Sequence, residues 1–146
     1  MDVRTWLLAL VALGIAGLTT ELLLLEHFED GWQIVPLFLL AQGAAAVMWQ
    51  AASPSMISTR FFQGTMALVA VAGALGVFLH YRGNLEFQLE IDATQSGWAL
   101  FRKVMHAKAP PALAPGAMTQ LGLLGLVYTF RHPALAPEAG EPELAE

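Results

Sequence analysis

The sequence predicts an all-α membrane protein, a bundle of four transmembrane helices with a short extended strand and an interfacial amphipathic helix between spans three and four. Two observations predict the bundle. Hydrophobic residues make up 56% of the 146-residue chain and charged residues only 13%, against about a quarter charged in soluble domains. The apolar residues also gather in four segments of spanning length, about 20 residues each, at 6–25, 34–52, 61–81 and 112–130.

The spans and their connections use almost the whole chain, so residues 1–132 form a single predicted domain. Spans and loops leave no room for a soluble catalytic domain, and the absence of cysteine excludes disulfides and thiolate chemistry. Residues 133–146 form an acidic tail rich in Pro and Ala, a composition typical of disorder. No basic patch of the kind that binds nucleic acid is present.

Aromatic residues bracket the spans, as expected at the two membrane interfaces. Trp6 opens the first span, and the others lie at Trp32, Trp49, Phe61, Tyr81, Tyr128 and Phe130. They support the four boundaries given above.

Basic residues in the short loops predict the orientation, because they are retained in the cytoplasm. Arg4, Arg60 and Arg131 fall on one side of the predicted bundle, and the turn at residues 26–33 on the other side has no basic residue. The loop at residues 82–111 weakens the rule, since it also carries basic residues. We expect both termini in the cytoplasm and a location in a cell membrane, of the bacterial inner-membrane type.

The loop after span three holds the predicted strand, over Leu85–Asp92. Leu85, Phe87, Leu89 and Ile91 alternate with polar residues, the period of a half-buried strand. No second strand of this quality occurs, so the strand either lies on the bundle or adds to the sheet of another chain. The predicted partner-binding residues are Leu85, Phe87, Gln88, Leu89 and Ile91.

A short amphipathic helix follows, with Ser96 as its cap. Trp98, Phe101 and Met105 recur at helical spacing on one side, and Arg102 and Lys103 lie toward water. This pattern predicts a helix in the membrane interface. Within the spans, small residues such as Gly73, Gly76, Gly122 and Gly125 predict close helix packing, and the mid-span amides Gln42 and Gln120 call for hydrogen-bond partners.

The densest polar group lies at the predicted noncytoplasmic end of the bundle. His27 follows span one and His80 ends span three, so both emerge at the same face. Imidazoles with carboxylates suit a divalent metal ion, and the candidate ligands are Glu26, His27, His80 and Glu86. A haem b between His27 and His80, with Arg82 near its propionates, is the other cofactor alternative. A solvated helix end with no cofactor is the leading interpretation.

Glu21 is an intramembrane carboxylate, and such a residue is a functional hypothesis by default. We expect a structural partner for it, either Arg82 or a neighbouring amide. His106 and His132 are interpreted as surface residues. No catalytic motif occurs, so the sequence favours a non-enzymatic accessory or assembly subunit, partnered by lipid and by other membrane subunits or further copies of itself. The alternative is a metal- or haem-binding protein for redox or ion handling.

Overall fold

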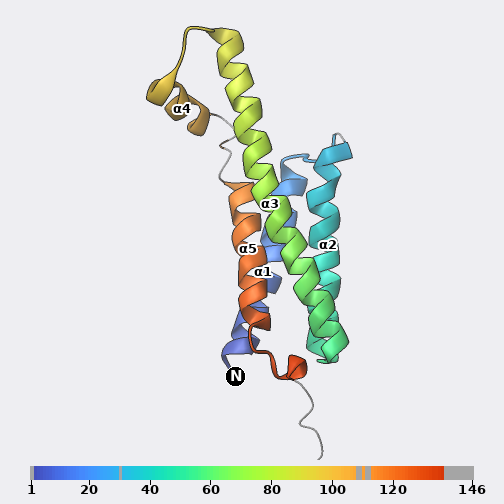
Figure 1. The fold of residues 1–146 in the computed structure, drawn as a ribbon. Helices are drawn as coiled ribbons and strands as arrows, with labels where there is room; N and C mark the ends of the chain where they lie inside the picture. Colours follow the sequence, from blue (N-terminus) through green and yellow to red (C-terminus); the bar gives the residue numbers. More distant parts are fainter. Residues whose placement is uncertain (1, 30, 108–109, 111–112, 137–146) are drawn as a thin grey trace, which may run out of the picture.

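The structure is a computed structural model that describes residues 2–29, 31–107, 110 and 113–136. Within these residues it is all-helical, with α1 (Val3–Leu24), α2 (Gly31–Ala52), α3 (Met56–Ile91), α4 (Gly97–Met105), α5 (Ala114–Thr129) and the short 3-10 helix η1 (Pro133–Leu135). The bundle is formed by α1, α2, α3 and α5, while α4 lies beside the far end of α3 (Figure 1). The predicted disorder of residues 137–146 falls outside the described residues.

Three of the helices, α1, α2 and α3, are long and apolar enough to cross a membrane. This finding supports a small membrane protein. The fourth predicted span corresponds to α5, which has 16 residues and is therefore about 24 Å long, shorter than the hydrocarbon core of about 30 Å. The sequence-based prediction of four full spans is thus supported for three of them.

The predicted strand at Leu85–Asp92 is wrong, because α3 continues without a break through Ile91. A helix satisfies its own backbone groups, whereas a lone strand has no neighbour to pair with. Helical spacing also explains the pattern: Leu85 and Leu89 are half-buried, while Phe87 and Ile91 are exposed. Gly83 and Asn84 do not end the helix. Their low helix propensity costs only about 1 kcal/mol each, and the Arg82–Glu86 pair at 2.8 Å spans the same turn.

Glycines allow α3 and α5 to approach most closely, and this pair makes the most extensive contact in the bundle. A Cβ atom on Gly122 would meet the backbone of Ala70 and Met66, and one on Gly73 would meet the backbone of Thr119. The predicted small-residue packing is confirmed here as contact within the chain. The core between the helices includes the fully buried Leu40, Phe62, Met66 and Val69.

The beginnings of the helices follow from local capping. Asp2 accepts a 2.8 Å hydrogen bond from the Thr5 backbone N–H at the start of α1, and Ser55 and Ser58 cap α3 reciprocally. Ser96 is the N-cap residue of α4, as predicted, although its side chain makes no capping hydrogen bond. The caps of α1 and α3 satisfy backbone donors that have no partner within the helix.

Candidate functional site

His27 and His80 come together at one end of the bundle, as the sequence predicts. Their ring centroids are 6.2 Å apart with an interplanar angle of 21°. The end of α1 positions His27: the backbone N–H of His27 bonds to Leu22 O at 2.9 Å and that of Glu26 to Leu23 O at 3.1 Å. These two bonds form a Schellman motif, in which Glu26 takes the left-handed conformation, with φ 52°, that glycine usually supplies.

The other predicted ligands do not complete a metal site around these rings. The Glu86 carboxylate bonds to Arg82 Nε at 2.8 Å and stays exposed, so Arg82 is engaged there as well. Glu26 is exposed in the turn after α1. No group of three or more His, Asp or Glu side chains suited to a metal ion occurs in the described part of the chain.

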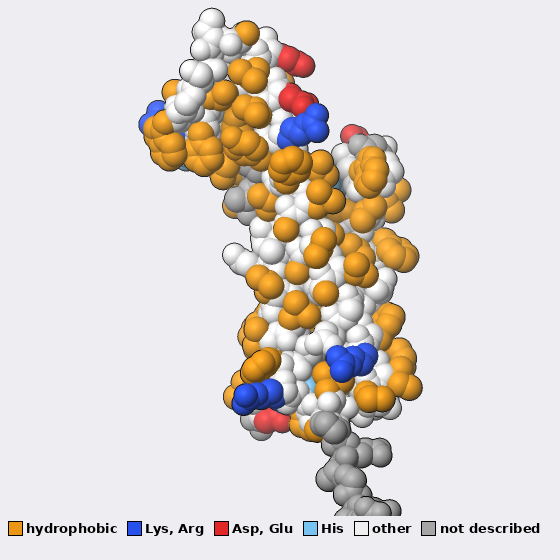
Figure 2. All heavy atoms as spheres, viewed as in Figure 1, with side chains coloured by type: hydrophobic (Ala, Val, Ile, Leu, Met, Phe, Trp, Pro, Cys, Tyr) orange, Lys and Arg blue, Asp and Glu red, His pale blue; other side chains and the backbone are white. Residues whose placement is uncertain are grey.

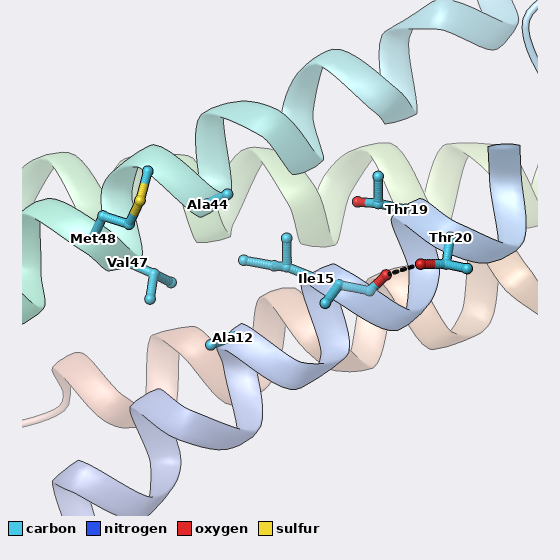
Figure 3. Close-up of a pocket in the computed structure, with 8 residues that line it drawn as sticks. Ala12, Ile15, Thr19, Thr20, Ala44, Val47 and Met48 are labelled. Atoms are coloured by element: carbon cyan, nitrogen blue, oxygen red, sulfur yellow. Dashed lines mark hydrogen bonds between the residues drawn. The ribbon is translucent and has the colours of Figure 1, made fainter.

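Glu21 is exposed on α1, and its neighbour Thr20 donates to Ala16 O at 2.8 Å. The expected partner Arg82 is bonded to Glu86 instead. Close to this position, a groove of about 420 Å³ lies between α1 and α2, seen in Figure 3. Its lining residues are mostly small or apolar: Ala12, Ile15, Ala16, Thr19, Thr20, Ala44, Val47 and Met48.

The opposite end of the bundle holds a buried polar network that sequence reasoning missed. Gln50 is at its centre: the Gln50 side-chain nitrogen lies 3.0 Å from the Tyr128 hydroxyl and 3.4 Å from His132 Nε2. On the other side, Ser58 Oγ and Thr59 Oγ1 donate to Gln50 Oε1 at 2.8 Å and 3.3 Å. All five side chains are buried, so the network joins α2, α3, α5 and the segment after α5.

Arg4 closes this network from the N-terminal end of α1. Its guanidinium donates to the carbonyl oxygens of Tyr128, Phe130 and Arg131 at 2.6, 3.1 and 2.9 Å. These carbonyls are at the C-terminus of α5, where backbone acceptors lack helical partners and a cation is favoured by the helix dipole. Arg4 therefore caps α5 as well as carrying charge at this end of the bundle.

The interpretation of His132 as a surface residue is wrong, since its exposed fraction is 8%. Burial, and then the positive charge of Arg4, lower the pKa of His132 below its ordinary value of about 6.5. Two sequence features could have indicated that His132 is buried. They are the i, i+4 spacing of Tyr128 and His132 and the polar residues on both sides of the α2–α3 turn. The exposed His106 agrees with its interpretation as a surface residue.

Interhelical pairing of Gln42 is confirmed, because its amide donates to Thr65 Oγ1 on α3 at 3.0 Å. Gln120 is exposed on α5.

Searches against protein-family models, curated proteins and solved structures found no match.

At the end away from the network, α3 and α4 form a lobe (residues 82–107) that extends beyond the bundle (Figure 1). Val104 is fully buried in it, and two side-chain amides join its parts: Asn84 Nδ2 lies 3.4 Å from Val104 O, and Gln95 Nε2 donates to Gln88 O at 3.1 Å. Of the predicted partner-binding residues, Leu85, Gln88 and Leu89 are half-buried, and Phe87 and Ile91 are exposed.

Proposed function

We propose that this small membrane protein is a non-enzymatic accessory subunit that binds a partner subunit through the outer face of α3 in the lobe. The observation that carries the proposal is the length of α3. Its last ten residues continue about 15 Å past the predicted end of span three. In this extension the side chains of Phe87 and Ile91 are exposed, with exposed fractions of 59% and 63%.

Large apolar side chains on an extension beyond the span have no lipid around them, and adjacent exposed apolar residues of this kind mark interaction sites. The same turns carry Glu86 and Glu90, both exposed. An apolar pair bordered by carboxylates resembles an interface with an apolar centre and a polar rim. The partner that fits is another membrane-anchored subunit, which can present a complementary surface at the same height above the membrane.

The test replaces both apolar residues and follows the native complex in membranes from the cells that make the protein. In blue-native electrophoresis, the wild type should migrate as one discrete complex, and Phe87→Ala with Ile91→Ala should release the free protein. Phe78→Ala is the matched control, because Phe78 lies on the same helix within the span and is 58% exposed. A wild type that migrates alone, or a control that dissociates equally, would contradict the proposal.

A second candidate function rests on the His27–His80 contact. Two imidazoles 6.2 Å apart are suited to hold a divalent metal, with water supplying the remaining ligands, or a haem b. Metal analysis and visible absorbance of the purified protein test this function. Stoichiometric metal or a Soret band should be lost in His27→Ala and His80→Ala and kept in His106→Ala, whose imidazole is exposed on the lobe. Protein that carries neither metal nor haem would exclude this candidate.

A further inference from the structure

One side of α4 presents aromatic rings that continue from the end of the third predicted span. Tyr81 is at that end, its ring lies 6.2 Å from that of Phe101, and Phe101 stacks on Trp98 at 5.1 Å. Trp98 is 72% exposed. The three rings therefore form a continuous series that leads from α3 to the surface of α4, which we call the aromatic strip (Tyr81, Phe101 and Trp98).

The basic residues of α4 follow the aromatic strip around one side of the helix, with Arg102 next to Trp98 and Lys103 farther round. At 100° per residue, Arg102 and Lys103 follow Trp98 by 40° and 140°, whereas Phe101 precedes it by 60°. Val104, which faces α3, is fully buried. In Figure 2 the hydrophobic side chains gather on the side of the lobe that faces the bundle, with blue basic side chains at its outer edge.

We propose that the aromatic strip is a lipid-binding surface that inserts into the interface of the outer leaflet, with Arg102 and Lys103 contacting anionic headgroups. Two arguments select lipid as the occupant. Tyr81 ends a span, so rings in contact with it lie at the height where Trp and Tyr are enriched in membrane proteins. Two cations beside an apolar helix face complement a negatively charged lipid surface.

This surface is separate from Phe87 and Ile91, so the inference goes beyond the proposed accessory role and does not depend on it. Lipid contact through α4 would fix the orientation of the lobe on the membrane. The outer face of α3 would then point away from the lipid toward a partner. The test uses purified protein in vesicles without any partner, so its failure would leave the accessory proposal standing.

Because the chain has no cysteine of its own, a spin label can be attached at one introduced cysteine at a time. Labels are placed singly at Trp98→Cys and Phe101→Cys on the aromatic strip. Ala99→Cys and His106→Cys are the controls, because both are exposed positions outside the strip and apart from the two basic residues. In vesicles of phosphatidylcholine with phosphatidylglycerol, the first pair should collide more with oxygen than with a water-soluble nickel chelate. The control pair should show the reverse ratio.

Equal accessibility of all four labels to the nickel chelate would overturn the proposal, because it would place α4 in water. Aromatic-strip labels shielded from both reagents would also overturn it, since protein and not lipid would then cover them. Removing phosphatidylglycerol, or combining Arg102→Gln with Lys103→Gln, should lower the oxygen-to-nickel ratio of the Phe101→Cys label. An unchanged ratio would refute the role of anionic headgroups.

A second measurement leaves Tyr81 and Phe101 unchanged. Lipids brominated near the headgroup quench nearby tryptophan, and the difference between the wild type and Trp98→Phe isolates Trp98 among the four tryptophans. The total intensity lost to bromine should fall in Trp98→Phe because one quenched indole has been removed. An unchanged loss of intensity would contradict insertion of Trp98.

Discussion

His132 links the segment after α5 to the bundle through both ring nitrogens. Nδ1 accepts the Ala134 backbone N–H at 3.2 Å, so the proton of the neutral ring is on Nε2, which faces the Gln50 side-chain amide at 3.4 Å. Because Gln50 Oε1 accepts from Ser58 and Thr59, the amide nitrogen of Gln50 faces this N–H, and the 3.4 Å approach is a contact without a hydrogen bond. A second proton, on Nδ1, would remove the acceptor of Ala134.

The pKa of His132 therefore predicts how stability depends on pH. Burial and Arg4 lower this pKa from about 6.5, so the unfolded state binds more protons than the folded state. The stabilisation by neutral His132 is complete above pH 6.5 and is lost as pH falls from 6.5 through the lower folded-state pKa. His132→Asn keeps an acceptor for Ala134 without titrating.

Thermal unfolding in detergent, compared at pH 7.5 and pH 5.5 for both proteins, measures this effect. The drop in midpoint should be larger for the wild type than for His132→Asn. The groups that face the ring, Arg4, Tyr128 and Gln50, are unchanged between the two proteins. Equal drops in the two proteins would show that His132 does not contribute to the pH dependence of stability.

Sequence patterns found only part of the polar chemistry. His27 and His80 were placed together because span lengths alone put both at one membrane face. The network around Gln50 could not be found in this way, since its members come from three helices and from the chain beyond α5. A hydrophobicity pattern does not register which polar residues at span ends face inward. Tyr128 shows the difficulty: its position suits an interface anchor, yet it is buried and bonded to Gln50.

At the scale of single elements, the close contact of α3 and α5 is the feature most sensitive to substitution. Gly122 lies against the backbone of Ala70 and Met66, which cannot move aside as a flexible side chain does. Gly122→Ala should therefore destabilise the bundle by about 1–3 kcal/mol. Gly116→Ala on the same helix is the matched control, because no atom lies within 4 Å of its added Cβ.

Unfolding in mixed micelles with increasing denaturing detergent compares these two variants. Gly116→Ala should be neutral or slightly stabilising, because alanine has the higher helix propensity by up to about 1 kcal/mol. If Gly122→Ala unfolds at the same detergent composition as Gly116→Ala, the close approach of α3 and α5 is not a source of stability.

The prediction of elements succeeded where length and hydrophobicity were sufficient and failed where periodicity was ambiguous. Three predicted spans became long apolar helices, α1, α2 and α3, although α3 continues ten residues past the expected end of span three. The segment Leu85–Asp92 alternates strictly, but over eight residues the same sequence also gives helical faces, with Leu85 and Leu89 half-buried and Phe87 and Ile91 exposed. The lack of a second strand was the decisive signal, because a helix needs no neighbour to satisfy its backbone.

At the scale of the whole molecule, the predicted orientation can be mapped with single cysteines. Gly31→Cys and Ala93→Cys lie toward the lobe end, and Ser53→Cys lies at the opposite end, in exposed positions of the turns. Arg4, Arg60 and Arg131 gather near Ser53, so an impermeant thiol reagent should label Gly31→Cys and Ala93→Cys in intact cells and leave Ser53→Cys unlabelled until lysis. The reverse pattern would place the lobe in the cytoplasm.

The contact between α3 and α5 also sets the order in which this protein can be completed. The helix that packs most extensively against α3 is α5, which follows α1, α2 and α3 in the chain, and Arg4 in the first turn of α1 binds a carbonyl at the end of α5. At typical rates of synthesis, the 89 residues between α1 and α5 take about 5–20 s. During that interval the surfaces of α1 and α3 that α5 will cover are open to the wrong neighbours, although α2 already contacts both helices. A ribosome that stops before α5 is made therefore leaves an inserted chain that cannot form the bundle.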